Sequence, residues 1–183
     1  SYFLDSKWYN FLNKVYYKPE IFMLTNNNMP KLSLIIFTGG NTSTYYSKKK
    51  ENYLREKLDK KIFLKAIKRK INCIGICWGA QSIAQIYKCK FLNSKKHVGK
   101  HHINLINKNF NKIFKKKYLV NSFHNQVIAS IKYPLKKIFL STDGNIEMYK
   151  HQSKKIYGIM WHPERNKKIS ILDKKIFSKI LCN

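Results

Sequence analysis

The residue with the clearest chemical potential in this sequence is Cys77, which lies between two glycines. The run Ile71-Asn-Cys-Ile-Gly-Ile-Cys77-Trp-Gly-Ala starts as an apolar, β-branched stretch and continues into residues typical of a helix. This pattern is typical of a nucleophile elbow, a strained strand-to-helix turn that lifts the sulfur out of the sheet. The helix dipole and free N–H groups would then favour a thiolate. The alternative is that Cys77 is a small buried hydrophobic residue, as we expect of Cys73.

A thiol nucleophile needs a base, and the run Ile156-Tyr-Gly-Ile-Met-Trp-His162-Pro-Glu164 offers one. An apolar strand is predicted to end at His162, and Glu164 follows two residues later. A carboxylate at this spacing can hold one ring nitrogen while the other faces the sulfur. A histidine at a strand end is by itself more often a core or surface residue, so this assignment depends on the Cys77 elbow. The backbone N–H of Trp78 would point at the oxyanion of a tetrahedral intermediate.

Strand-like and helix-like segments alternate along the chain, which predicts an α/β domain with a largely parallel sheet. Apolar residues have helical spacing in 5–17, 51–68, 80–87 and 169–181. Strands are expected at 21–24, 32–38, 71–76, 119–120, 138–141, 146–149 and 156–160. We find no repeat and no linker long enough to divide the chain, so residues 1–183 are expected to form a single domain. Polar residues of the second helix, including Arg55, are expected either at the mouth of the site or on a solvated face.

The chain has a formal net charge of +28, which raises the question of nucleic-acid binding. Only three of its 37 basic residues are arginine, the residue that reads base edges with two parallel hydrogen bonds. The lysines scatter along the whole chain among many Asn and Ile residues. We therefore interpret the charge as a compositional bias and do not favour specific nucleic-acid recognition. A nonenzymatic, basic nucleic-acid-binding protein is kept as an alternative. A basic surface would also steer a small anionic substrate toward a cleft.

Sequence signals for membranes, disulfides and metals are weak. No apolar run reaches the ~18 residues of a membrane span, the first residues lack signal-peptide features, and the four cysteines have no disulfide or zinc-knuckle spacing. We expect a cytoplasmic protein without membrane contact. His97, His101 and His102 lie close together, but no carboxylate or cysteine at ligand spacing completes a metal site. They are expected in a solvated or substrate-adjacent loop, with Glu147 and His151 on the surface of a later strand. No metal or cofactor is expected.

Four motifs together resemble the class I glutamine amidotransferases. They are the Gly39-Gly40 loop, Gly75-Ile-Cys77-Trp-Gly-Ala-Gln81, Val120-Asn-Ser-Phe-His124-Asn-Gln and Trp161-His-Pro-Glu164. More narrowly, they are similar to the γ-glutamyl hydrolase branch, which includes the γ-glutamyl-GABA hydrolases. The order Cys, His, Glu matches, and the resemblance covers nearly the whole chain. It implies a three-layer, flavodoxin-like α/β sandwich with a mostly parallel central sheet.

This resemblance also implies roles for individual residues. Cys77 would carry a γ-glutamyl thioester, with His162 as the base and Glu164 orienting it. The oxyanion donors would be the backbone N–H groups of Trp78 and of Gly40, in the Gly39-Gly40 loop. The residues expected to hold the glutamyl head group are Gln81, Ser122, Phe123 and His124.

A narrower resemblance is to a subgroup found in bacterial surface-polysaccharide gene clusters, with a member that releases glutamate from γ-glutamyl-CDP-amidate, a nucleotide phosphoramidate. It rests on Asp5-x-x-Trp8-x-x-Phe11-Leu12, Leu24-Thr-Asn-Asn, Asp143-Gly-Asn-Ile-Glu147 and Ile159-Met-Trp-His-Pro-Glu-Arg165. It implies a small-molecule γ-glutamyl substrate with an anionic leaving group, used in capsule modification. A glutaminase subunit that delivers ammonia to a synthase partner shares the triad and is the second-ranked alternative.

The sequence departs from this subgroup in three places. Trp78 stands where the subgroup often has arginine, and the helix after the elbow lacks the usual glycine pair. The chain also begins at the first helix, without the family's opening strand. Either the sequence is truncated or the sheet is one strand short.

Overall fold

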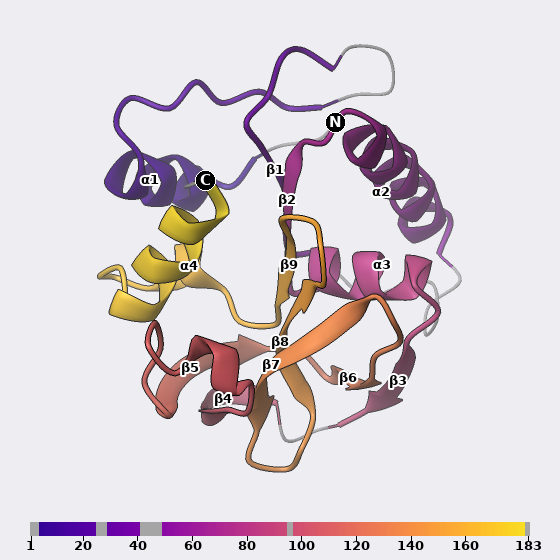
Figure 1. Ribbon diagram of the computed structural model, residues 1–183. Coiled ribbons are helices and arrows are strands. Elements are labelled where there is room, and N and C mark those ends of the chain that lie inside the picture. Colours follow the sequence, from indigo (N-terminus) through magenta and orange to yellow (C-terminus); the bar gives the residue numbers. More distant parts are fainter. Residues whose placement is uncertain (1–3, 25–28, 41–48, 95–96, 182–183) are drawn as a thin grey trace.

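A curled sheet with helices on both faces forms the protein, as Figure 1 shows for the computed structural model, which describes residues 4–24, 29–40, 49–94 and 97–181. The helices are α1 (Ser6–Val15), α2 (Lys50–Lys68), α3 (Trp78–Ile86) and α4 (Ile171–Leu181), with the 3-10 turns η1 (Lys108–Phe110) and η2 (Pro163–Arg165). The strands are β1 (Leu34–Phe37), β2 (Asn72–Ile76), β3 (Lys90–Asn93), β4 (Val98–Leu105), β5 (Lys117–Phe123), β6 (Gln126–Ser130), β7 (Leu135–Ser141), β8 (Ile146–His151) and β9 (Ile156–Ile159).

The sheet has a parallel part and an antiparallel part. Its strands follow the order β1-β2-β9-β8-β7-β4-β5, while β6 pairs with both β3 and β8. Only the β1–β2 and β2–β9 pairings are parallel among the described strands. The predicted α/β class is confirmed, but the prediction that the sheet is mostly parallel is wrong. Connections as short as 142–145 and 152–155 can join only antiparallel neighbours, since a parallel crossover needs a dozen or more residues.

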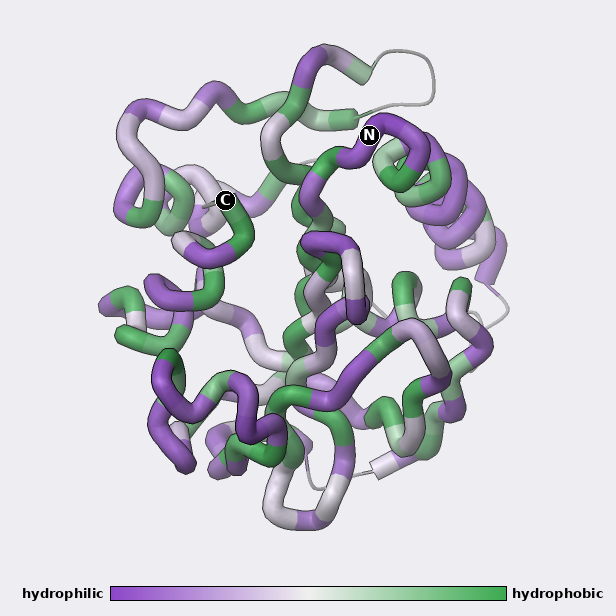
Figure 2. Tube along the Cα trace, in the orientation of Figure 1, coloured by the Kyte–Doolittle hydropathy of each residue, from purple (hydrophilic) through white to green (hydrophobic). Residues whose placement is uncertain are grey.

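Two apolar cores, one on each face of the parallel strands, hold the layers together. On one side Phe11 of α1 and Ile176 of α4 pack with Ile74 of β2. On the other side Phe63 of α2 and Ile83 of α3 belong to a second cluster that includes Cys73, Phe37 and Ile156. Because both faces are covered, the parallel strands read as continuous apolar runs. In Figure 2 the central strands are mainly hydrophobic, whereas α2 is mainly hydrophilic along its length.

The predicted helices are all present, whereas the strand predictions hold only in part. Residues 21–24 contain no strand, and the predictions missed β3, β4 and β6. β4 reads Val-Gly-Lys-His-His-Ile-Asn-Leu, with few apolar residues to alternate, so its sequence does not show the period of a strand. None of the helices in the described ranges is both long enough and apolar enough to cross a membrane.

Candidate active site

Cys77 lies in a strained turn between β2 and α3. Its backbone has φ 49° and ψ −102°, a conformation that residues with a side chain rarely adopt. The flanking glycines are required by close packing. A Cβ on Gly75 would stand 2.5 Å from the backbone nitrogen of Ala80, and one on Gly79 would stand 1.9 Å from the carbonyl oxygen of Phe37. The Gly-x-Cys-x-Gly pattern therefore reflects steric need, because no residue larger than glycine fits at position 75 or 79.

The thiol of Cys77 is buried at the start of α3. Burial raises its pKa to about 12, and the nearby carboxylate of Glu164 adds to this, although the backbone N–H of Trp78 acts in the opposite direction. The thiolate expected from the helix N-terminus is therefore not the resting form of this cysteine, because desolvation outweighs the helix end. A pKa in this range corresponds to a protonated sulfur at neutral pH.

His162 and Glu164 form a buried pair just after β9. The distance from His162 Nδ1 to Glu164 Oε1 is 2.6 Å, and the two residues are only 2% and 8% exposed. The backbone of His162 is held by Asn121 of β5: the Asn121 amide donates to the His162 carbonyl at 2.7 Å, and the His162 N–H donates to Asn121 Oδ1 at 2.8 Å. Asn121 belongs to one of the four family-like motifs, but its role was not predicted from the sequence.

The topology brings Cys77 and His162 to the same edge of the sheet. β2 and β9 are parallel neighbours with Ile76 opposite Ile159, and the N–H of Cys77 donates to the Ile159 carbonyl at 2.8 Å. Gly39 follows β1 and packs on the imidazole, since a Cβ there would stand 2.4 Å from His162 Cε1. The carboxyl ends of parallel strands are where open α/β sheets place their sites. Gly39, Cys77, His162 and Glu164 are thus brought together.

Arg55 of α2 fixes the loop that follows β1. Its guanidinium donates to the carbonyl oxygens of Thr38 (2.8 Å) and Gly39 (3.1 Å), and it lies 5.1 Å from the centroid of the Trp78 ring. A Cβ on Gly40 would stand 2.2 Å from Arg55 Nη1. Arg55 therefore contacts the site instead of lying on a solvated face. It positions the Gly39-Gly40 loop, whose oxyanion role stays a prediction.

The four residues expected to hold a glutamyl group differ in burial and in hydrogen bonding. Gln81 is buried and donates to the Gln126 carbonyl at 3.1 Å. The Ser122 hydroxyl donates to the His97 carbonyl, and His124 is buried, which lowers its pKa to about 4. Phe123 is half exposed, with its ring centroid 5.6 Å from that of His162. The ring of Phe123 packs edge-on against His162, and the substrate-binding roles of all four residues stay predictions.

A cluster of histidines and one carboxylate lies beyond this group, where the sequence predicted a solvated loop and surface residues. Glu147 is fully buried on β8, His97 is 2% exposed beside β4, and the side chain of His101 is 15% exposed. His151 is also buried, and its Nδ1 accepts the N–H groups of Ser153 and Lys154. The expectations of a solvated loop and of surface residues are wrong because β4 and β8 lie inside the sheet, while the substrate-adjacent alternative stays a prediction. Of the three neighbouring histidines only His102 is exposed.

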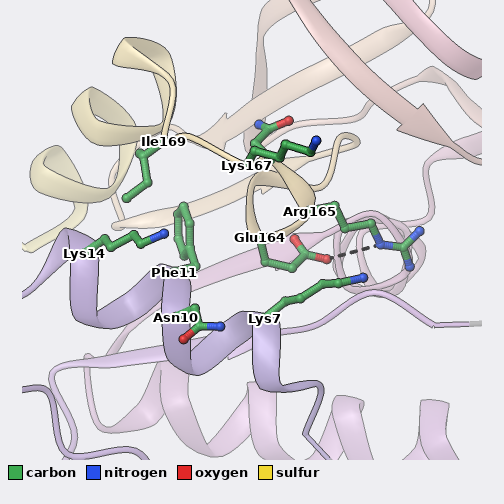
Figure 3. A pocket seen from close by; sticks show the side chains of 9 residues that line it. Lys7, Asn10, Phe11, Lys14, Glu164, Arg165, Lys167 and Ile169 are labelled. Atoms are coloured by element: carbon green, nitrogen blue, oxygen red, sulfur yellow. Dashed lines mark ion pairs between the residues drawn. The ribbon is translucent and has the colours of Figure 1, made fainter.

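Figure 3 shows a basic pocket next to Glu164, between α1 and η2. The volume of this pocket is about 260 Å³. Its cationic side chains are Lys7, Lys14, Arg165 and Lys167. Arg165 Nε lies 3.7 Å from Glu164 Oε1, and its guanidinium lies 4.5 Å from the centroid of the Phe123 ring. The pocket could attract an anionic group close to the proposed triad.

The sequence is similar to those of two named bacterial proteins. It is 34% identical over 134 residues to the γ-glutamyl-CDP-amidate hydrolase of Campylobacter jejuni, an alignment that covers 73% of this chain and 63% of the relative. It thus spans less than two thirds of that relative's length. It is 26% identical over 174 residues to the glutamine amidotransferase-like protein YvdE of Lactococcus lactis, covering 82% of this chain and 74% of the relative.

Solved structures support the fold. A chain in the structure of PurLQS from Thermotoga maritima aligns with a TM-score of 0.74 and 22% identity, covering 97% of this chain and 91% of that one. At this identity the similarity concerns the fold alone. Residues 23–164 match the Peptidase C26 family, a segment that includes Gly39, Cys77, His162 and Glu164. Because the match covers most of the sequence, this chain belongs to the Peptidase C26 family.

Proposed function

We propose that this protein is a cysteine-dependent hydrolase that cleaves a γ-glutamyl amide bond and releases glutamate. The observation that carries the proposal is the buried His162–Glu164 pair at the end of β9, next to the Cys77 elbow at the end of β2. A nucleophile, a base and an orienting carboxylate in this order are the parts that acyl transfer requires. The γ-glutamyl half of the substrate is proposed from the family and from the named relatives.

The mechanism follows from the neutral thiol. Glu164 occupies Nδ1 of His162, so Nε2 is the nitrogen that accepts the thiol proton as sulfur attacks the γ-carbonyl carbon. The oxyanion is received by the backbone N–H groups of Trp78 and Gly40. His162 then gives the proton to the leaving nitrogen, and the carbon–nitrogen bond breaks to leave a thioester on Cys77. Water, deprotonated by His162, hydrolyses the thioester and frees glutamate and the thiol.

The leaving group is proposed to be a nucleotide phosphoramidate, as in γ-glutamyl-CDP-amidate. The named Campylobacter relative acts on this compound, and the basic pocket beside Glu164 offers cations to a phosphorylated group. We propose that the reaction serves capsule or surface-polysaccharide modification and takes place in the cytoplasm, where a thiol nucleophile stays reduced. A comparison of kcat/KM for γ-glutamyl-CDP-amidate, γ-glutamyl-GABA and glutamine tests the leaving group. A preference for either of the last two would overturn the nucleotide assignment but keep the hydrolase.

The catalytic proposal is tested by Cys77→Ala, with Cys73→Ala as the matched control. Both cysteines are buried, but Cys73 lies within β2 and belongs to the apolar core, whereas Cys77 follows the carboxyl end of that strand. Cys77→Ala is expected to lower kcat by about 10⁴-fold or more, the usual result of removing the nucleophile from a unit that acts together. Cys73→Ala is expected to retain kcat within a few-fold. Turnover by Cys77→Ala at the wild-type rate would show that the nucleophile is elsewhere.

A further inference from the structure

We propose that His97, His124 and Glu147, with His101, form a binding site for a divalent transition-metal ion such as Zn²⁺. One ligand atom from each of His97, His124 and Glu147 lies within 4.8 Å of the others. His97 Nδ1 and His101 Nε2 each lie 3.1 Å from the same carboxylate oxygen, Glu147 Oε1. Neighbouring ligands around a tetrahedral zinc ion are about 3.3 Å apart for metal–ligand distances near 2.0 Å. The two contacts to Glu147 Oε1 have nearly that spacing, whereas His124 lies within 4.8 Å and would move closer to an ion.

Several polar atoms of this cluster make ion-pair contacts but no well-directed hydrogen bond. Among the described residues, no hydrogen bond reaches His97 Nδ1, His101 Nε2, either ring nitrogen of His124 or either carboxylate oxygen of Glu147. The 3.1 Å approaches are therefore not directed as hydrogen bonds. Buried polar atoms normally have a hydrogen-bond partner, so atoms on four neighbouring side chains without a well-directed hydrogen bond fit a set of metal ligands. An ion placed between the nitrogens and the oxygen would satisfy them together.

The surroundings resemble those of a metal site. His97 Nε2 lies 3.0 Å from Asp143 Oδ2, and the other oxygen of Asp143 accepts the Ser141 hydroxyl at 2.5 Å. A carboxylate on the far nitrogen fixes the tautomer of a metal-binding histidine and leaves Nδ1 free for the ion. The backbone of His97 is fixed as well, since its carbonyl accepts the Ser122 hydroxyl and the His124 N–H.

A route from the surface reaches the cluster. A pocket of about 230 Å³ is lined by His97, His101, Ser141, Thr142 and Asp143. The set of three imidazoles and one carboxylate favours zinc or a similar ion over a hard cation such as Mg²⁺, which prefers oxygen ligands. It also favours a metal over an ammonium group, which would require several acceptor oxygens. The ion would link β4, β8 and the turn between β5 and β6, three segments that lie apart in the sequence.

Zinc binding to the tag-free, chelator-treated protein tests the proposal. The measurement is made in the Cys77→Ala background, so that the thiol of the proposed nucleophile, paired with His162, does not bind zinc itself. Isothermal titration with Zn²⁺ is expected to show one site per chain, and Co²⁺ is expected to give the visible absorption bands of tetrahedral coordination. Glu147→Gln is expected to weaken Zn²⁺ binding by about 100-fold. His102→Asn is the matched control, since its side chain is exposed on the same strand, and it should leave the affinity unchanged.

Three results would overturn the metal site. The first is the absence of stoichiometric Zn²⁺ binding. The second is an equal Zn²⁺ affinity of the Glu147→Gln and His102→Asn variants. The third is a Tm that rises when glutamate is added but does not change when Zn²⁺ is added. If Glu147→Gln fails to fold, His101→Asn serves in its place, because His101 is the least buried of the four residues. None of these measurements depends on turnover, so they do not affect the proposed hydrolase.

Discussion

Gly39→Ala perturbs the proposed base without touching its chemistry. The added Cβ would stand 2.4 Å from His162 Cε1, whereas ordinary contact begins at 3.4 Å. The imidazole must therefore move by about 1 Å away from β1. A displacement of this size can cost about 10²-fold in rate, which corresponds to about 2.7 kcal/mol of transition-state stabilisation. Gly39 does not have a left-handed φ, so alanine adopts its backbone without strain and the fold is expected to persist.

The assay is glutamate release from a γ-glutamyl substrate, with kcat/KM measured beside the Tm of the same preparation. Ser33→Ala is the control, because Ser33 is exposed and precedes β1 at the end of the strand opposite Gly39. We expect Gly39→Ala to lower kcat/KM by about 10²-fold, with a change in Tm of only a few degrees, and Ser33→Ala to match the wild type. Unchanged kcat/KM in Gly39→Ala would refute the placement of the imidazole against this loop.

Three further predictions concern the same site. Glu164→Gln is expected to lower kcat by about 10²- to 10⁴-fold while the protein stays folded, because the imidazole loses its orienting charge; a rate at the wild-type level in the glutamate-release assay would assign that role elsewhere. Arg55→Lys is expected to lower both Tm and kcat/KM, since an ammonium cannot hold two loop carbonyls in the fork geometry of a guanidinium; a variant equal to wild type in both measurements would contradict this. Alkylation of Cys77 by iodoacetamide in the free protein, followed by mass spectrometry, is expected to accelerate about tenfold per pH unit from roughly pH 7 to 10. The sign follows from the pKa of about 12, since the thiolate fraction keeps rising below that value; a plateau near neutral pH would show a pre-ionised thiolate.

The parts of the fold that could be predicted are those that depend on residues close together in the sequence. The glycines around Cys77 and the carboxylate two residues after His162 are local patterns, and each reflects a local steric or hydrogen-bonding need. The helices were predicted because their apolar spacing is also local. The direction of a strand is not encoded in a local pattern, and for this reason the sheet was predicted as mostly parallel. It depends on connection length and pairing in space, and a run such as Ile146–His151 looks the same in either direction.

The histidine cluster could not be predicted for a related reason. Glu147 lies 50 residues after His97 and 46 after His101, so no local spacing connects them. They meet because β4 pairs with β7 and β7 pairs with β8. In the sequence Ile-Glu-Met, Glu147 looks like an exposed residue of a strand that alternates apolar and polar side chains. It is buried because this part of the sheet is covered on both faces, which the local sequence does not reveal. Asn121 was missed for the same reason, since its partner His162 is 41 residues away.

The neutral thiol explains why so many contacts converge on one imidazole. A sulfur that keeps its proton at rest can attack only as that proton leaves, so the rate of the proposed reaction depends on where the acceptor nitrogen stands. Glu164 holds Nδ1, Asn121 holds the backbone on both sides, and Gly39 lies against the ring. A pre-ionised thiolate would need less of this positioning and would react with any electrophile that reached it. In the proposed mechanism, burial of Cys77 restricts the reaction to a substrate that brings its carbonyl to the sulfur while His162 is in place.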